Sequence, residues 1–351
     1  MRNVRVAIWG FGAMGRGIAE MLLKKKGVEI VGVCDINPGI VGKAMHDVLE
    51  IRRDGHPDVI IKDKIEDVVK SGACDVALLA TDSFTKNAFD KIKFCLEQKA
   101  NVISTAEEFA YPKAQEPQLA DEICKIAKAN GVTALGTGIN PGFVLDYLIL
   151  ALTGTCETVT AIKASRVNDL SPFGHAVMEE QGVGITKAEF DKRIAEDSLA
   201  GHVGFPESIT MIADGIGWKL DKIEQTKDAI VSNVDRETKY VKVAPGSLAG
   251  IRQQGFGTVD GVVKITMDHP QQVLPHLENQ STGDYINIEG TPNINMQITP
   301  EIPGGIGTIA MVVNMIPHVV NANPGLKTML DLPVPRAIMG DFRDFIDHEL
   351  Q

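Results

Sequence analysis

The sequence has few of the residues that disulfide frameworks and metal centres need. Its five cysteines are odd in number and widely spaced, and no C-x-x-C pair occurs among them. The eight histidines include no H-x-x-x-H pair. These absences argue against a disulfide-rich secreted domain and against a zinc site. We therefore expect reduced, mostly buried cysteines, no bound metal and a cytoplasmic location.

Positive charge and long apolar runs are also scarce. The 35 lysines and arginines are outnumbered by 46 acidic residues, which leaves a net charge of −11. Such a balance argues against nucleic acid or an anionic membrane as a partner. No apolar run approaches about 20 residues, and the chain enters a strand almost at once, so we expect neither a membrane span nor a secretory signal.

What is present is a regular alternation of strands and helices over roughly the first 135 residues. Apolar strands at 28–34, 75–81, 101–105 and 132–136 are separated by helical segments. This alternation predicts a Rossmann-type, doubly wound parallel sheet. Ligands of such sheets lie at the carboxyl ends of the strands.

The pattern changes after about residue 150. Segments such as 158–166 and 285–290 alternate apolar and polar residues, which predicts half-buried strands of a mixed sheet that is open on one face. The expected fold class is α/β, with an N-terminal Rossmann domain at 1–140, completed by C-terminal helices within 315–351, and a second α+β domain at 141–314. The second domain is expected to bind substrate and, because its open sheet face needs a cover, to form a homodimer.

The most informative motif is the glycine turn that follows the first strand, Gly10-Phe11-Gly12-Ala13-Met14-Gly15. Gly10 permits a tight turn, Gly12 leaves room for a pyrophosphate, and Gly15 lets the following helix pack close to the sheet. The N-terminus of that helix attracts phosphate. A glycine turn that binds nothing is the alternative, but the strand–turn–helix context predicts a dinucleotide cofactor.

Asp35 ends the second strand, where a carboxylate can accept both ribose hydroxyls. It would repel a 2′-phosphate, and no lysine or arginine follows until Lys43, so NAD is favoured over NADP, although many such sites accept both. The candidate cofactor-binding residues are Gly10, Phe11, Gly12, Ala13, Met14, Gly15, Asp35, Thr81, Asp82, Thr105 and Asn140.

Two adjacent carboxylates, Glu107 and Glu108, follow the strand at 101–105 and so fall at the ligand edge of the sheet. They are either solvated residues in the first turn of a helix, or one of them lines the cleft, where burial would raise its pKa and suit it to proton transfer near neutral pH. Asn140 lies in the turn at 138–143. It either holds the substrate or the nicotinamide amide, or belongs to a plain interdomain turn.

Three further places could carry chemistry. Arg166 and Asn168 lie two residues apart at the end of a strand and share one face, which suits a carboxylate ligand, although a surface ion pair is the commoner role of an arginine. His202, between glycines, is either solvent-exposed or a cleft residue that hydrogen-bonds substrate. The glycines at 304–308 form either a second phosphate loop or, as we favour, a turn that permits close packing before an apolar helix at 309–320.

Residues 10–15, 101–112, 138–143 and 166–173 together resemble the family of 2,4-diaminopentanoate dehydrogenases and native amine dehydrogenases, which have an N-terminal domain like that of dihydrodipicolinate reductase. The resemblance extends over nearly the whole chain. Its most specific part is the run Ser-Thr-Ala-Glu-Glu-Phe-Ala-Tyr-Pro that ends at Pro112. The His-His motif of true dihydrodipicolinate reductases is absent, so the substrate pocket differs from theirs.

The resemblance implies NAD(P)-dependent oxidative deamination of an amine, in particular of 2,4-diaminopentanoate to 2-amino-4-oxopentanoate and ammonia in amino acid (ornithine) catabolism. The essential glutamate of the family is matched by Glu107, with Glu108 as the alternate, and Arg166 and Asn168 would hold the substrate carboxylate. The implied substrate-binding residues are Phe143, Arg166, Asn168, Phe173, His202 and Thr308. Another oxidoreductase of the same group and a non-catalytic dinucleotide sensor are the rival interpretations.

Overall fold

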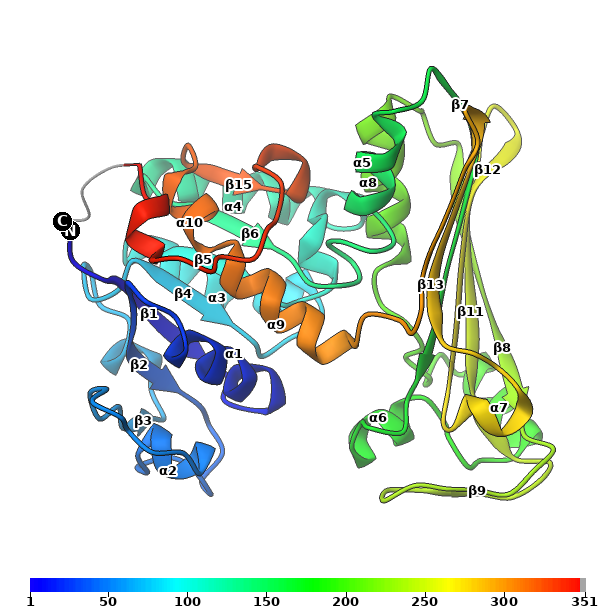
Figure 1. Cartoon of the computed structure of the whole chain (residues 1–351), viewed down its shortest axis with the longest axis horizontal. Helices are drawn as coiled ribbons and strands as arrows, with labels where there is room; N and C mark the ends of the chain where they lie inside the picture. Colours follow the sequence, from blue (N-terminus) through cyan, green and yellow to red (C-terminus); the bar gives the residue numbers. More distant parts are fainter. Residues whose placement is uncertain (348–351) are drawn as a thin grey trace. The chain divides into compact units, whose positions relative to one another are not determined.

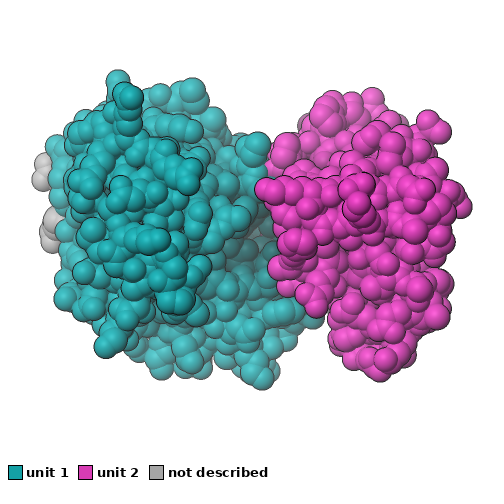
Figure 2. Space-filling view, turned by 90° about the horizontal axis from the view of Figure 1, so that it is seen from below, with its two compact units in different colours: residues 1–143, 304–351 teal, residues 144–303 magenta. Residues whose placement is uncertain are grey.

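A computed structural model describes residues 1–347 of the chain. The chain forms two compact units, one of residues 1–143 and 304–351 and the other of residues 144–303 (Figure 2). The polypeptide therefore passes between the units twice. The expected second domain ended at 314, whereas the return to unit 1 comes at Gly304, because the helix that begins there packs within unit 1.

Unit 1 is built on a seven-stranded sheet in the order β15-β6-β5-β4-β1-β2-β3, and every pair of neighbours is parallel. The prediction of a doubly wound parallel sheet is thus confirmed. The interior strands β4 and β6 are buried at every residue, as expected where helices cover both faces. The strands are β1 (Val4–Trp9), β2 (Val28–Cys34), β3 (Ile61–Lys62), β4 (Val76–Leu79), β5 (Asn101–Ser104), β6 (Thr133–Gly136) and β15 (Gly325–Lys327).

The helices of unit 1 pack through apolar stripes at helical spacing. Helix α1, for example, buries Gly15, Ile18, Ala19 and Leu22, three or four residues apart. The helices are α1 (Ala13–Leu23), α2 (Met45–Leu49), α3 (Thr85–Glu97), α4 (Pro117–Asn130), α9 (Gly304–Asn314) and α10 (Ile316–Asn321). Short 3-10 turns lie at η1 (Ile65–Asp67), η2 (Glu108–Ala110), η3 (Pro112–Ala114), η5 (Met329–Asp331) and η6 (Phe342–Phe345).

Helix α9 begins earlier than the sequence suggested. Its first residue is Gly304, so the glycines expected in a turn at 304–308 belong to the first turns of the helix. Helices α1 and α9 pack closely where α1 carries Gly17, since a Cβ there would lie 2.2 Å from Ile309 Cδ1. In the described part of the chain, one stretch, Gly304–Asn321, is apolar and long enough to cross a membrane. Core helices pass the same test, and 61% of this stretch is buried in the fold.

Unit 2 is built on a six-stranded sheet in the order β14-β13-β7-β12-β11-β8. Only β7 and β12 pair in parallel, so the predicted mixed sheet is confirmed. The strands are β7 (Thr158–Asp169), β8 (Lys222–Val231), β11 (Leu248–Val259), β12 (Val262–Gln272), β13 (Gly283–Thr291) and β14 (Ile294–Ile298), with a separate hairpin of β9 (Arg236–Glu237) and β10 (Lys242–Val243).

Helices cover one face of this sheet, where Figure 1 shows α5 and α8. Close packing is possible because β11 presents glycines to α8: a Cβ at Gly255 would lie 2.9 Å from the ring of Phe205. The other face carries exposed polar side chains, including the ion pairs Lys163–Glu289 and Arg252–Asp268. The helical elements of unit 2 are α5 (Tyr147–Thr153), α6 (His175–Glu180), α7 (Lys187–Ala195), α8 (Phe205–Ile216) and η4 (Pro275–Glu278).

Candidate functional site

The three glycines of the turn after β1 each meet a different steric demand. Gly10 has φ +93°, and a Cβ on it would lie 2.6 Å from the carbonyl oxygen of Ala80. A Cβ on Gly15 would lie 1.9 Å from the carbonyl oxygen of Gly10, so only glycine lets α1 start this close to the turn. A Cβ on Gly12 would meet nothing within 4 Å. The open space at Gly12, next to the N-terminus of α1, fits the pyrophosphate of a dinucleotide.

Asp35 lies beside this turn, as the ribose-binding role requires. Its Oδ2 accepts the backbone N–H of Phe11 at 2.5 Å, and its Oδ1 accepts that of Asn37 at 2.8 Å. The side chain of Phe11 is fully buried, which leaves only its backbone for contact with a cofactor. Arg16, which the sequence analysis passed over, donates from Nε to the carbonyl oxygen of Phe11 at 3.1 Å.

The end of β4 also reaches the turn. A Cβ at Gly10 would lie 2.8 Å from Cγ2 of Thr81, so the structure brings Thr81 against the glycine turn. Asp82 is held differently, because its Oδ2 accepts the hydroxyl of Thr81 at 2.5 Å and pairs with Lys91 Nζ at 2.6 Å. The candidate cofactor residues of unit 1 thus gather at the carboxyl ends of β1, β2 and β4.

The two adjacent glutamates have different environments. Glu108 is buried, and its Oε2 accepts the backbone N–H of Thr85, the first residue of α3, at 2.6 Å. Its own N–H donates to the carbonyl oxygen of Ser83 at 3.0 Å. Burial raises the pKa of Glu108, partly opposed by the bond from Thr85. Glu108 therefore caps a helix, whereas the half-buried Glu107 lies outside this cap.

The segment that carries Glu107 is fixed between strand ends. The N–H of Thr105 donates to the carbonyl oxygen of Leu79 at 2.9 Å, at the end of β4. A Cβ on Gly136, at the end of β6, would lie 2.1 Å from the carbonyl oxygen of Phe109. The segment therefore lies at the carboxyl edge of the sheet, where the sequence placed it.

The turn that holds Asn140 is joined to α9. Gly142 has φ +124°, and a Cβ on it would lie 2.6 Å from the N of Gly138. Thr308, in α9, accepts the N–H of Ile139 through its hydroxyl at 3.2 Å. Unit 1 thus brings Thr308 and Asn140 into one region although 168 residues separate them in the sequence.

In unit 2, Arg166 lies in a buried ion pair. Its side chain is 3% exposed, and Nη1 donates to Oδ1 of Asp284 at 2.5 Å. Nη2 donates to the carbonyl oxygen of Ile302, whose N–H donates to Oδ2 of Asp284 at 3.0 Å. Burial raises the pKa of Asp284, and the charge of Arg166 opposes that rise. Neither sequence interpretation of Arg166 describes this arrangement, since the guanidinium is neither in a surface pair nor open to a substrate carboxylate.

Asn168 lies two residues further along β7 and is also buried, which fits the predicted shared face. Its Oδ1 is buried and has no hydrogen-bond partner within residues 1–347. A buried amide oxygen without a donor is costly, so this atom is suited to accept a hydrogen bond from a bound ligand.

His202 is half-buried and packs against two neighbouring rings. Its ring packs edge-on to Phe205, with centroids 4.9 Å apart, and to His269, with centroids 5.0 Å apart. Burial, and then the charge of Arg166, lowers the pKa of His202 to about 3, so the ring is neutral at ordinary pH. Because β12 supplies His269 from a distant segment, no local sequence signal pointed to it.

The backbone of His202 is held by one side chain. The amide of Gln253 accepts the N–H of His202 at 2.7 Å and donates to its carbonyl oxygen at 2.9 Å. The preceding residue, Gly201, has φ +63°, and a Cβ on it would lie 2.3 Å from Oε1 of Gln253. The loop position of His202 is therefore fixed by β11.

Phe173 packs elsewhere in unit 2. It lies against a cluster that includes Met178 and Val243, and Phe143 is the last, half-buried residue before the first crossing between the units. The structure thus brings Arg166 and His202 together around His269, and it does not place Phe173 in the same cluster.

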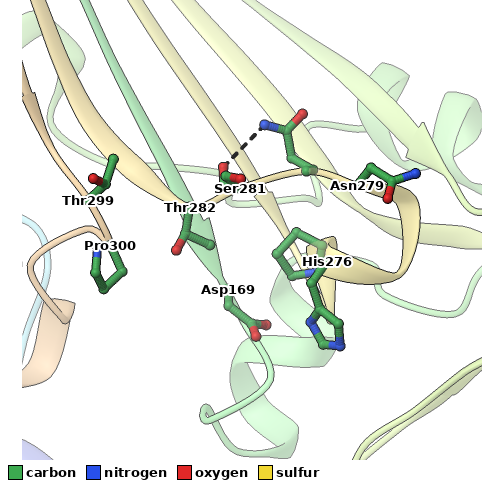
Figure 3. A pocket seen from close by; sticks show the side chains of 9 residues that line it. Asp169, His276, Asn279, Ser281, Thr282, Thr299 and Pro300 are labelled. Atoms are coloured by element: carbon green, nitrogen blue, oxygen red, sulfur yellow. Dashed lines mark hydrogen bonds between the residues drawn. The ribbon is translucent and has the colours of Figure 1, made fainter.

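A polar cavity of about 710 Å³ lies at the carboxyl end of β7 (Figure 3). Oδ1 of Asp169 accepts the N–H groups of Ser171 and Leu274 there. The lining contains none of the residues that the sequence analysis proposed as substrate ligands. It consists of Asp169, Pro275, His276, Asn279, Gln280, Ser281, Thr282, Thr299 and Pro300.

Comparison with known proteins places the chain in a family. A family model described as the 2,4-diaminopentanoate dehydrogenase C-terminal domain matches residues 143–348, and one described as the N-terminus of dihydrodipicolinate reductase matches residues 4–130. A 2,4-diaminopentanoate dehydrogenase from Acetoanaerobium sticklandii is 59% identical over 350 residues, which are 99% of each chain.

More distant relatives agree over nearly the full length. An amine dehydrogenase from Streptomyces virginiae is 25% identical over 357 residues, covering 95% of this chain and 98% of the relative. The solved structure of an amine dehydrogenase from Mycobacterium smegmatis has a TM-score of 0.85 at 26% identity, covering 96% of this chain and 98% of that one. The chain belongs to the 2,4-diaminopentanoate dehydrogenase family and is therefore a dehydrogenase that uses a nicotinamide dinucleotide.

Proposed function

We propose that the protein catalyses the oxidative deamination of 2,4-diaminopentanoate. The substrate, NAD⁺ and water would give 2-amino-4-oxopentanoate, ammonium, NADH and a proton. The observation that carries this proposal is the 59% identity to a protein of that name along 99% of both chains. The glycine turn with open space at Gly12 supports it, because it supplies the cofactor site that the reaction needs.

The cofactor would be held by unit 1. The N-terminus of α1 and the backbone around Gly12 would bind the pyrophosphate, and Asp35 would accept hydrogen bonds from the ribose hydroxyls. When bound there, the cofactor would supply the hydride-accepting chemistry that oxidation of an amine requires. We propose NAD as the preferred cofactor, since the carboxylate of Asp35 repels a 2′-phosphate.

Glu107 is the proposed general base. Its neighbour Glu108 is engaged by the N–H of Thr85, whereas Glu107 is half-buried at the carboxyl edge of the sheet and matches the essential glutamate of the family that the sequence resembles. Its carboxylate would take a proton from the substrate ammonium, because only the neutral amine releases hydride readily. It would later take a proton from the water that adds to the imine carbon, and its negative charge would stabilise the iminium cation.

In unit 2, the substrate ligands are proposed to be Asn168 and His202. The orphaned Oδ1 of Asn168 would accept an N–H of the substrate, and the neutral ring of His202 would hydrogen-bond a polar group. Arg166 is committed to Asp284, so we assign it the positioning of β7 and of the segment at Ile302 rather than a substrate carboxylate. We also propose that the substrate contacts the apolar side chains of Phe143 and Phe173 and the hydroxyl of Thr308.

The test is NADH formation by the purified protein with 2,4-diaminopentanoate, measured beside a panel of simple amines and alcohols. The proposal expects the diamino acid to give the highest kcat/KM. A higher kcat/KM with an alcohol or a simple amine would assign a different oxidoreductase activity. Binding of NADH without turnover of any compound would indicate a dinucleotide sensor.

A homodimer and a cytoplasmic location are also proposed. The open face of the unit 2 sheet supports the dimer because it is not covered by helices and carries charges of both signs, as in the pairs Lys163–Glu289 and Arg252–Asp268. The five cysteines, all free, fit a reducing compartment. Light scattering after size exclusion tests the dimer: a mass of about twice 37.9 kDa supports it, and the monomer mass contradicts it.

A further inference from the structure

The loop of residues 199–203, between α7 and α8, carries His202 and is held by side chains of other elements. Nζ of Lys227, on β8, donates to the carbonyl oxygen of Leu199 at 2.7 Å. Gln181, directly after α6, donates from Nε2 to the carbonyl oxygen of the residue before His202 at 2.8 Å. The position of the loop therefore depends on side chains from separate parts of unit 2.

Gln253, on β11, contacts the loop on both sides of the Cα of His202. Its Oε1 accepts the N–H of His202 at 2.7 Å, and its Nε2 donates to the carbonyl oxygen of His202 at 2.9 Å. Nε2 also donates to Oε1 of Gln225 at 2.9 Å, so both N–H donors of the amide are in use. Turning the amide over would break these bonds, and the side chain, which is 2% exposed, has no access to water that could replace them.

The two bonds from Gln253 determine where the ring of His202 lies. The N–H and the carbonyl group of a residue belong to the two planar peptide units on either side of its Cα. Because both units are fixed, the direction of the Cα–Cβ bond is fixed as well, and the ring is placed edge-on to Phe205 and His269. A side chain that is held in advance loses little conformational freedom when it binds a substrate.

We propose that Gln253 is a positioning residue for the amine oxidation and that it acts through His202, whose ring it holds where the substrate binds. The inference rests on the proposed function, in which His202 is a substrate ligand. Gln181 assists, because it bonds the carbonyl end of the same peptide unit whose N–H Gln253 accepts.

The experiment is a double-mutant cycle in steady-state kinetics. Wild type, Gln253→Leu, His202→Ala and the double variant are compared, with whichever compound of the amine and alcohol panel gives the wild type its highest kcat/KM. We expect Gln253→Leu to raise KM by about 10-fold, the value of one hydrogen bond to the substrate. Its kcat should change by less than about threefold, because the proposed base and cofactor site lie in unit 1. In the His202→Ala background the same substitution should raise KM by less than about twofold, since no ring is left to position.

Gln254→Leu is the matched control. Gln254 is the next residue of β11 and faces the opposite side of the sheet, away from the loop. This variant should keep the wild-type KM and kcat. Gln181→Leu is a second test variant, which removes one bond to the loop and should raise KM in the same His202-dependent way even if Gln253→Leu does not fold. Thermal unfolding identifies the folded variants.

A KM that rises by the same factor in both backgrounds would show that Gln253 acts on activity through the fold in general, and it would overturn the inference. A KM that neither glutamine substitution changes would also overturn it. If the wild type turned over none of the compounds, or if His202→Ala kept the wild-type KM, the proposed function or its ligand would fail together with the inference. Independent losses in an active protein whose KM depends on His202 would contradict the inference alone.

Discussion

The carboxylate of Glu108 accepts the backbone N–H of Thr85 at 2.6 Å, so one member of an adjacent acidic pair closes the N-terminus of α3. The other member, Glu107, lies outside that cap. The two neighbouring glutamates therefore differ in role: Glu108 caps α3, and Glu107 is the proposed general base. Substitutions at the two positions can be compared directly.

Glu107→Gln should lower kcat for amine oxidation by about 10²–10⁴-fold, the usual contribution of a general base. The amide keeps the size of the side chain but cannot take a proton. Initial rates of NADH formation give kcat, and NADH fluorescence should show a cofactor Kd close to that of the wild type. A kcat near the wild-type value would remove Glu107 from the mechanism.

Glu108→Ala should act on stability instead. It removes the acceptor of a buried N–H at the start of α3, which should lower the free energy of unfolding by about 1–3 kcal/mol. Urea denaturation measures the loss, and kcat per folded molecule should stay within a few-fold of the wild type. If Glu108→Ala instead abolished kcat with the fold intact, the roles of the two glutamates would have to be exchanged.

Gly12→Ala and Gly15→Ala should separate cofactor binding from folding. An alanine Cβ at Gly12 meets no protein atom within 4 Å, so the fold should survive while the methyl group intrudes on the pyrophosphate space. A Cβ at Gly15 would lie 1.9 Å from the carbonyl oxygen of Gly10, so that variant should lose stability. Thermal unfolding measures the stability of each variant, and NADH titration measures its cofactor affinity. An unchanged NADH Kd in Gly12→Ala would contradict the expected pyrophosphate position.

The Arg166–Asp284 pair should be costly to break from one side. Asp284→Asn leaves the guanidinium buried with a neutral partner, and Arg166→Met leaves a buried carboxylate with no cation, a change that typically costs about 3–5 kcal/mol. The double variant should be more stable than Arg166→Met alone, because no unpaired charge remains. Urea denaturation of the three variants gives the coupling, and simple additivity would show that the two side chains do not act as a pair.

The ring of His202, half-buried and packed against Phe205 and His269, should make stability depend on pH. Its pKa is about 3 in the folded protein, while an unfolded histidine titrates near 6.5. Below about pH 6.5 the unfolded chain therefore binds a proton that the folded chain does not, and the free energy of unfolding falls as the pH falls. This effect approaches about 1.4 kcal/mol per pH unit.

The measurement is urea denaturation between pH 8 and pH 5 for the wild type and for His202→Asn. The variant should lose stability less steeply below pH 6.5, whatever its stability at pH 8. His269, whose pKa burial also lowers, contributes to the slope that remains. Parallel curves for the two proteins would show that His202 is not buried as a neutral ring.

Local sequence patterns were enough to predict those parts of unit 1 whose structure depends on residues close together in the sequence. The strand, glycine turn and helix around Gly12 follow from hydrophobic period and steric need, both readable within about 20 residues. The role of Glu108 did not, because its donor, Thr85, lies 23 residues away on another helix. The partner of Arg166 is 118 residues distant, so a carboxylate ligand was a reasonable expectation for a side chain that folding had already neutralised.

The start of α9 shows a second limit. Glycine is a poor helix former, so Gly304 and its neighbours suggested a turn, yet they begin the helix. Tertiary packing favours them there: a Cβ at Gly307 would lie 2.9 Å from Ile139, which leaves no room for a larger residue. Helix propensity depends only on the segment itself, whereas the residue that packs against it, Ile139, lies 168 residues earlier in the sequence than Gly307.

The amide of Gln253 satisfies both main-chain groups of His202, so the path of that loop does not depend on which side chain position 202 carries. The loop conformation and the side chain at position 202 are therefore specified by different residues. Gln253 and Gly201 fix the backbone, and residue 202 supplies the side chain. A substitution at position 202 can therefore change the side chain presented there while the loop keeps its conformation. A substitution at Gln253 would disturb the loop and the side chain that it presents. With the proposed role of His202 in substrate binding, a single substitution at position 202 could change the substrate range.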